Sequence, residues 1–175
     1  MLANVIAFQV GWFACVLGAA LGWPLIGTAV ALAIVAWHVR QARPARAELA
    51  LILIAAAIGA LFDSVLTALR WIVYPNGTLI PGTAPYWIVM LWMLFATTLN
   101  VSLSWLKHRL AVAIVFGAIG GPLAYLGGAK LGALELANRP AALLALALGW
   151  AILMPMLLAV ASRYDGYAYR RVRTR

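Results

Sequence analysis

Long apolar runs, separated by short basic or turn-forming segments, dominate the chain. Six runs are candidate membrane helices, because a bilayer core about 30 Å thick needs roughly 20 helical residues. They cover about residues 2–21, 24–39, 47–72, 85–106, 110–131 and 141–161. With 66% apolar and 10% charged residues, the chain is too apolar for an ordinary soluble or nucleic-acid-binding domain. We therefore predict an all-α, polytopic transmembrane bundle of six helices, forming one domain over residues 1–175.

The lysines and arginines predict the orientation of this bundle. Of the 13 basic residues, ten follow the second, fourth or sixth run: Arg40, Arg43, Arg46, Lys107, Arg109, Arg163, Arg170, Arg171, Arg173 and Arg175. The other three, Arg70, Lys130 and Arg139, fall on the opposite side. Because cytoplasmic loops carry the excess of positive charge, we expect both termini in the cytoplasm. Residues 162–175 are then a basic cytoplasmic tail near anionic headgroups.

The third run has one face that should turn away from lipid. Ala56, Gly59, Asp63, Thr67 and Arg70 share that face at 100° per residue, and large apolar side chains share the opposite one. A carboxylate in hydrocarbon is costly, so Asp63 should face the bundle, and Gly59 one turn earlier should let a partner helix approach. Either Arg70 leans back toward Asp63, with Thr67 between them, or Arg70 extends to the interface and another helix satisfies Asp63.

The fourth run is also predicted to have two faces. One carries Met90, Met93, Thr97, Asn100 and Ser104, and the other carries Ile88, Trp92, Phe95, Leu99 and Leu106. Asn100 needs a hydrogen-bond partner, and Asn4 in the first run lies at a similar depth. Gln9 is about 140° from Asn4 around a helix, so one narrow face cannot present both. These amides either line a ligand site or only hold helices together.

The fifth run contains a candidate helix break. Gly120, Gly121 and Pro122 follow one another near mid-membrane, and a proline removes a helical hydrogen bond. Discontinuous helices often line substrate sites in transporters, although a structural kink is the commoner explanation.

Recognisable catalytic and cofactor motifs are absent from the sequence. We find no phosphate-binding loop, dinucleotide fingerprint or nucleophile elbow. His38 and His108 are the only histidines, and both lie near the predicted cytoplasmic boundary without nearby acids or thiols. Two histidines are too few for a metal site, so we expect no catalytic site, metal or cofactor.

Three segments resemble a bacterial family of small inner-membrane proteins of unknown function. They are Asn4 with Gln9–Trp12, then Pro85–Trp87 leading to Phe95–Asn100, then Gly117–Tyr125. The resemblance covers nearly the whole chain and implies a multi-pass protein of the bacterial inner membrane. Members often occur beside enzymes that modify fatty acids, which implies a lipid-linked role and a membrane-bound lipid-modifying enzyme as a partner. The family has no established catalytic residue to carry over.

Three functional hypotheses remain open at this point. The first is a non-catalytic protein that binds membrane lipids or accompanies a lipid-modifying enzyme, with a homo-oligomer possible and no nucleic-acid partner. The second is a small-solute or proton-coupled transporter or channel that uses Asp63 and the Gly120–Pro122 break. The third, an intramembrane enzyme with Asp63, His38 or His108 as acid or base, has the least support because the acid and the histidines fall at opposite leaflets.

Overall fold

The computed structural model describes residues 1–168, and over that range the protein is built from α-helices. The six α-helices are α1 (Leu2–Ala20), α2 (Pro24–Gln41), α3 (Ala45–Ala68), α4 (Tyr86–Leu99), α5 (Leu110–Lys130) and α6 (Arg139–Arg163), with a short 3-10 helix, η1, at Ser104–Leu106. Every helix except α4 is long and apolar enough to cross a membrane. The all-α fold class is therefore confirmed.

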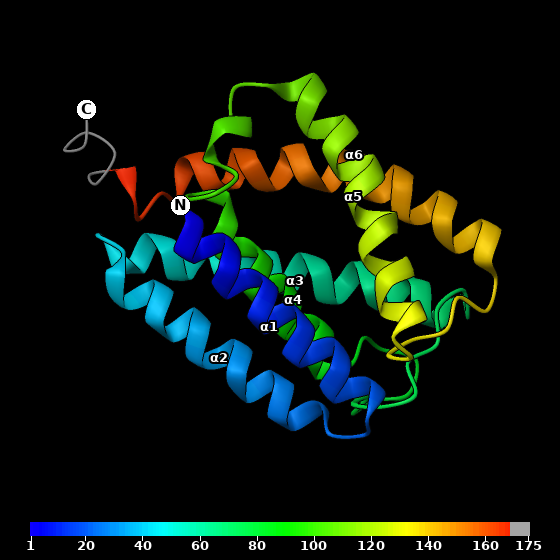
Figure 1. Ribbon diagram of the computed structural model, residues 1–175. Helices are drawn as coiled ribbons and strands as arrows, with labels where there is room; N and C mark the ends of the chain where they lie inside the picture. Colours follow the sequence, from blue (N-terminus) through cyan, green and yellow to red (C-terminus); the bar gives the residue numbers. More distant parts are fainter. Residues whose placement is uncertain (169–175) are drawn as a thin grey trace.

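Two helical hairpins flank a central pair of helices (Figure 1). α1 packs against α2, α5 packs against α6, and α3 and α4 lie between the hairpins. Glycines allow both hairpins to pack closely: a β-carbon on Gly27 would lie 2.2 Å from the carbonyl oxygen of Ala14, and one on Gly117 would lie 2.2 Å from that of Trp150. Such small-residue contacts are typical of helix pairs in membranes.

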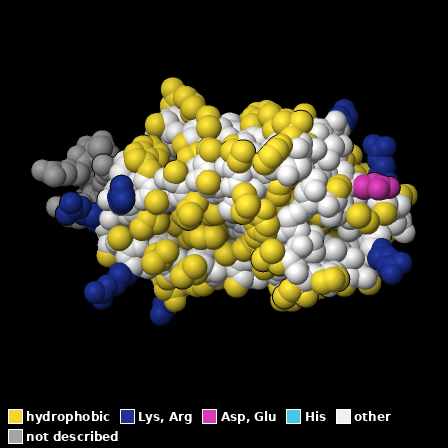
Figure 2. All heavy atoms as spheres, turned by 90° about the horizontal axis from the view of Figure 1, so that it is seen from below, with side chains coloured by type: hydrophobic (Ala, Val, Ile, Leu, Met, Phe, Trp, Pro, Cys, Tyr) yellow, Lys and Arg dark blue, Asp and Glu magenta, His cyan; other side chains and the backbone are white. Residues whose placement is uncertain are grey.

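The surface has the charge distribution of a membrane-spanning bundle. Figure 2 shows lysine and arginine side chains toward the two ends of the visible face, with a broad uncharged and largely apolar belt between them. Figure 1 places the start of α1 and the end of α6 at the same end of the molecule. Of the predicted basic tail, Arg170, Arg171, Arg173 and Arg175 lie outside the described residues.

Helix α3 ends earlier than the expected boundary at residue 72. Its last residue is Ala68, and Arg70 adopts a left-handed backbone conformation with φ 55°. The amide of Trp71 then donates to the carbonyl of Leu66, and the amide of Arg70 donates to that of Thr67. These two hydrogen bonds form a Schellman motif, which terminates the helix by satisfying its last carbonyls.

Helix α4 is shorter than the expected run 85–106 and is buried all round. It ends at Leu99, and a turn leads into η1. Thr97 and Thr98 donate their hydroxyls to carbonyls three residues earlier, which competes with helix continuation. Trp92 and Leu99, which the sequence places on the large apolar face, are only 3% and 0% exposed because α1, α2, α3 and α6 surround α4. The predicted two-faced pattern of this run is wrong.

Helix α5 is continuous through Gly120, Gly121 and Pro122, so the expected break does not occur. Gly117 and Gly121 are buried against α6, whereas a β-carbon on Gly120 would meet only the ring of Phe116, at 4.0 Å. The glycines thus serve close packing on one side of α5 and leave open space on another.

Candidate functional site

Asp63 on α3 is the centre of a buried hydrogen-bond cluster that joins this helix to three other parts of the chain. Its Oδ1 accepts from the hydroxyls of Tyr74 (2.8 Å) and Tyr125 (2.6 Å), and its Oδ2 accepts from Nε1 of Trp92 (2.7 Å). The side chain is fully buried, and none of the described lysines or arginines pairs with it. Three neutral donors thus satisfy the oxygens of the acid without a cation.

The predicted inward face of α3 brings this cluster together. Ala56, Gly59 and Asp63 are buried, and a β-carbon on Gly59 would lie 2.0 Å from the ring of Trp92. Gly59 therefore lets the indole of α4 lie against α3 and reach the acid one turn away. This confirms the expected close approach, made here by a tryptophan.

The first alternative for Arg70 is wrong, and the part of the second that has another helix satisfy Asp63 is confirmed. Arg70 lies beyond α3 and is exposed, so it cannot lean along that helix toward Asp63. Thr67 does not bridge them either, because its hydroxyl donates back to the backbone carbonyl of Asp63 at 2.8 Å. Trp92 and Tyr125 from other helices satisfy the acid instead.

Tyr74 reaches Asp63 from the loop between α3 and α4. Burial raises the pKa of the Tyr74 phenol well above its ordinary value, and the negative charge of Asp63 adds to that effect. The phenol therefore remains protonated and continues to donate to the acid at any physiological pH.

A second buried polar cluster lies at the opposite end of the bundle, around Glu48. The His38 imidazole is 2.7 Å from Glu48 Oε1, while Glu48 Oε2 accepts from Asn100 (2.8 Å) and from the backbone amide of Gly166 (3.1 Å). Lys107 extends the cluster, donating to Asn100 and to Asp165. These bonds attach the chain after α6 to α2, α3 and the end of α4. The hydrogen-bond partner that Asn100 was expected to need is therefore Glu48 and not Asn4.

The remaining predicted polar residues divide between two environments. Asn4 is buried, donates to the carbonyl of Thr97 at 3.1 Å and accepts from Ser102 at 2.7 Å, which joins α1 to the end of α4. Gln9 is exposed on another face of α1, as their angular separation predicts. His108 is exposed beyond η1, whereas His38 is buried, so the two histidines have different surroundings.

An elongated apolar groove lies between the two hairpins. It has a volume of about 410 Å³, and its walls come from α1, α4, α5 and α6. On α1 the lining runs from Val5 to Val16, which is about 16 Å of helix. On α5 it runs from Phe116 to Gly128, so both walls follow the long axis of the helices. Val5 and Phe116 are 42% exposed, so the groove opens toward the surroundings of the bundle.

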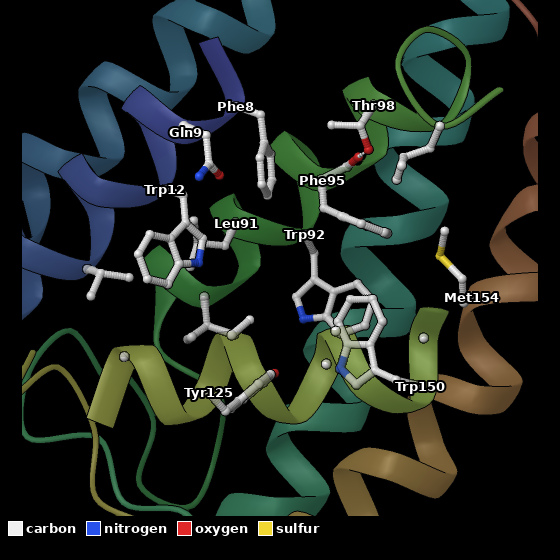
Figure 3. A pocket seen from close by; sticks show the side chains of 18 of the residues that line it. Phe8, Gln9, Trp12, Leu91, Trp92, Phe95, Thr98, Tyr125, Trp150 and Met154 are labelled. Atoms are coloured by element: carbon white, nitrogen blue, oxygen red, sulfur yellow. Dashed lines mark hydrogen bonds between the residues drawn. The ribbon is translucent and has the colours of Figure 1, made fainter. Parts of the chain in front are cut away.

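Aromatic side chains dominate the lining of this groove (Figure 3). Trp92 and Trp150 stack with ring centroids 4.7 Å apart, and Phe95 meets Trp150 edge-on at 5.2 Å. The lining has no charged side chain. Trp92 and Tyr125 belong both to the groove wall and to the Asp63 cluster, so the acid lies directly behind the lining. Such a groove can bind an extended apolar molecule, and a polar group on that molecule would meet only neutral donors and acceptors.

Neither polar cluster has the composition of a metal site. Within residues 1–168, no group of three or more histidine, cysteine, aspartate or glutamate side chains could hold a metal ion. The acids are already engaged by tyrosine, tryptophan, histidine and asparagine side chains.

Fold and site together define a multi-pass membrane protein with an uncharged intramembrane groove. The chain belongs to the family described as "Protein of unknown function (DUF2878)", whose model matches residues 1–156. No curated protein and no solved structure matches the chain.

Several residues of the site were not among the sequence candidates. They are Glu48 in one polar cluster, Tyr125 and Trp92 in the other, and Trp150 in the groove lining. In the sequence, the two tryptophans and the tyrosine look like ordinary residues of a membrane helix. A signal for Glu48 was present: it lies 15 residues before Asp63, or about 60° away around the helix, so both belong to one inward face of α3.

Proposed function

We propose that this protein binds the apolar part of a membrane lipid in the groove between its two hairpins, as a non-catalytic component of a lipid pathway. The observation that carries the proposal is the groove itself. Its volume of about 410 Å³ falls within the range of about 300–1,000 Å³ that is typical of ligand pockets. Its elongated form suits a chain lying along the bilayer normal.

The surroundings of the groove favour a lipid as its occupant. Three of the four helices that line the groove, α1, α5 and α6, are long and apolar enough to span a bilayer, so the molecules next to its open side are acyl chains. An uncharged, aromatic lining offers such a chain dispersion contacts over its length. A water-filled channel would instead require polar groups along the wall.

The charge bias of the loops supports a cytoplasmic position for both termini in a bacterial inner membrane. Glu48, Lys107 and Asp165 then form the polar cluster of the cytoplasmic end, and Asp63 lies nearer the outer leaflet. A lipid-modifying enzyme as partner and a homo-oligomer remain part of this proposal.

We do not propose transport as the function, because the two features that suggested it, a helix break in α5 and an unpartnered Asp63, are not found in the structure. α5 has no break at Gly120–Pro122, and three donors within the bundle engage Asp63.

Gly120 provides the variant that tests lipid binding. A leucine there would extend into the groove, since a β-carbon at Gly120 meets only Phe116, at 4.0 Å. Ala111→Leu is the matched control: it adds apolar volume on an exposed position of the same helix, outside the groove lining. We expect protein purified in mild detergent to retain bound lipid by native mass spectrometry in the wild type and Ala111→Leu, and to lose most of it in Gly120→Leu. Equal lipid retention in all three proteins would refute the proposal.

A further inference from the structure

The two long walls of the groove converge toward one end of the bundle. A β-carbon on Gly127, late in α5, would lie 3.4 Å from the ring of Trp12 on α1. One on Gly132, just after α5, would lie 3.8 Å from the β-carbon of Ala20, the last residue of α1. Figure 1 shows α1 and α5 lying well apart where both helices begin. The groove is therefore a wedge that narrows toward the ends of α1 and α5.

Exposure of the lining changes in the same direction. Val5 and Phe116 line the wide end, in the early turns of α1 and α5, and both are exposed. Val16, Trp87 and Leu134 line the narrow end, and all three are buried. An apolar chain can therefore enter the groove at the wide end, whereas the narrow end is closed by packed side chains.

The wide end belongs to the basic end of the molecule, where α1 begins and α6 ends (Figure 1). The chain has four acidic residues. Glu48 and Asp63 are buried, Asp165 pairs with Lys107, and Glu135 lies beyond the other end of α5. Among the described residues, the basic end thus presents no exposed acid, and such a surface attracts anionic headgroups. Its exposed arginines are Arg40, Arg43, Arg46, Arg109 and Arg163.

Arg109 is the arginine of this group that the chain places next to the groove. It lies between Leu103 and Phe116, and both of these residues line the groove. Arg109 precedes Phe116 by seven residues, or almost two helical turns, so the two positions share one side of α5 about 10 Å apart. The Arg109 guanidinium lies 5.6 Å from the ring centroid of Trp105, an exposed residue of a type that is enriched at headgroup depth.

We propose that the groove binds one acyl chain of an anionic phospholipid from the cytoplasmic leaflet, with the phosphate beside Arg109 and the chain end toward the narrow end. A phospholipid of the other leaflet would have to enter at the narrow end, which Val16, Trp87 and Leu134 close. This inference rests on the proposed function and its orientation, since it names the lipid class and the leaflet from which the lipid comes.

Lipid titration of the full chain in mild detergent, followed by native mass spectrometry, tests the headgroup. Phosphatidylglycerol and phosphatidylcholine with the same acyl chains form a matched pair of probes. We expect the wild type to prefer phosphatidylglycerol and Arg109→Gln to bind it about 5-fold more weakly, the effect of one basic residue at a membrane surface. Arg109→Lys keeps the charge and should keep the preference. Arg46→Gln is the control, because Arg46 is exposed at the same end on α3, which contributes nothing to the lining.

Photo-cross-linking in lipid nanodiscs tests the direction of the bound chain. Two phosphatidylglycerol probes carry a diazirine on the acyl chain, one near the carboxyl end and one near the methyl end. We expect the carboxyl-end probe to label α1 near Val5 and the methyl-end probe to label it within residues 12–16. Both labels should be lost in Gly120→Leu, which fills the groove. The reverse pattern, or the same pattern from both probes, would overturn the inference.

The outcomes of the titration separate this inference from the proposed function. If the wild type binds both lipids equally and Gly120→Leu loses both, the groove binds lipid without regard to charge, and the inference is overturned while the proposed function stands. If Gly120→Leu binds both lipids as the wild type does, both proposals fall. Equal losses in Arg46→Gln and Arg109→Gln would assign the preference to the overall charge of that end and overturn the place given to the phosphate.

Discussion

Replacing Asp63 by leucine should destabilise the protein more than any other single polar change in the bundle. The substitution removes the acceptor that holds Tyr74, Trp92 and Tyr125, at 2.8, 2.7 and 2.6 Å. Leucine has the same branched shape with larger terminal groups and no acceptor, so the substitution leaves three buried donors without a partner. The phenol hydroxyls can rotate toward other acceptors, but the indole N–H of Trp92 is fixed by its ring.

The magnitude follows from these three bonds. Interhelical hydrogen bonds in membrane proteins average about 0.6 kcal/mol each, which gives a lower bound of about 2 kcal/mol. An orphaned buried donor costs about 1–3 kcal/mol, so the two donors that remain if rotation rescues one hydroxyl raise the upper bound to about 6 kcal/mol. We therefore expect the free energy of unfolding to fall by about 2–6 kcal/mol.

Reversible unfolding in mixed micelles, with increasing fractions of a denaturing detergent, measures this change. Thr67→Val is the matched control, one turn away on α3, because the Thr67 hydroxyl bonds only to a carbonyl of its own helix. We expect the control to change the free energy of unfolding by less than about 0.5 kcal/mol. A loss below about 1 kcal/mol for Asp63→Leu would refute the view that this acid holds the cluster together.

Two further predictions concern the opposite end of the bundle and its orientation. In Glu48→Gln, the glutamine side chain cannot accept hydrogen bonds at both positions where the carboxylate oxygens were. Hydrogen exchange of the backbone amides after α6, measured by mass spectrometry, should therefore accelerate several-fold. Unchanged exchange would contradict the role given to Glu48. In a cysteine-free background, a membrane-impermeant maleimide should label Leu79→Cys in intact cells and label His108→Cys only after permeabilisation. Labelling in the reverse pattern would invert the proposed topology.

Much of the fold could be predicted from the sequence, because bilayer thickness fixes the length of an apolar helix. Helices α2 and α6 begin at Pro24 and Arg139, close to the predicted starts at about residues 24 and 141. The inward face of α3 followed from its period. The ends of α3 and α4 could not be predicted in this way. The Schellman motif at Arg70 and the threonine hydroxyls that bond to the α4 backbone depend on local geometry more than on hydropathy.

The site was predictable only in part. Asp63 and Asn100 were recognisable because a buried acid or amide in a membrane helix must find a partner. Their actual partners were not, since any of several helices could have supplied them. The groove could not be predicted at all, because it arises from how the α5–α6 hairpin lies against α1 and α4, and Trp92 and Trp150 look the same in sequence whether they face lipid, core or a cavity.

Cryo-electron microscopy of the protein in lipid nanodiscs tests the account most directly. We predict elongated non-protein density between α1, α4 and α5, following the Val5–Val16 face and touching Trp150. A structure in which α5 closes onto α1 and the two walls meet without intervening density would contradict the account.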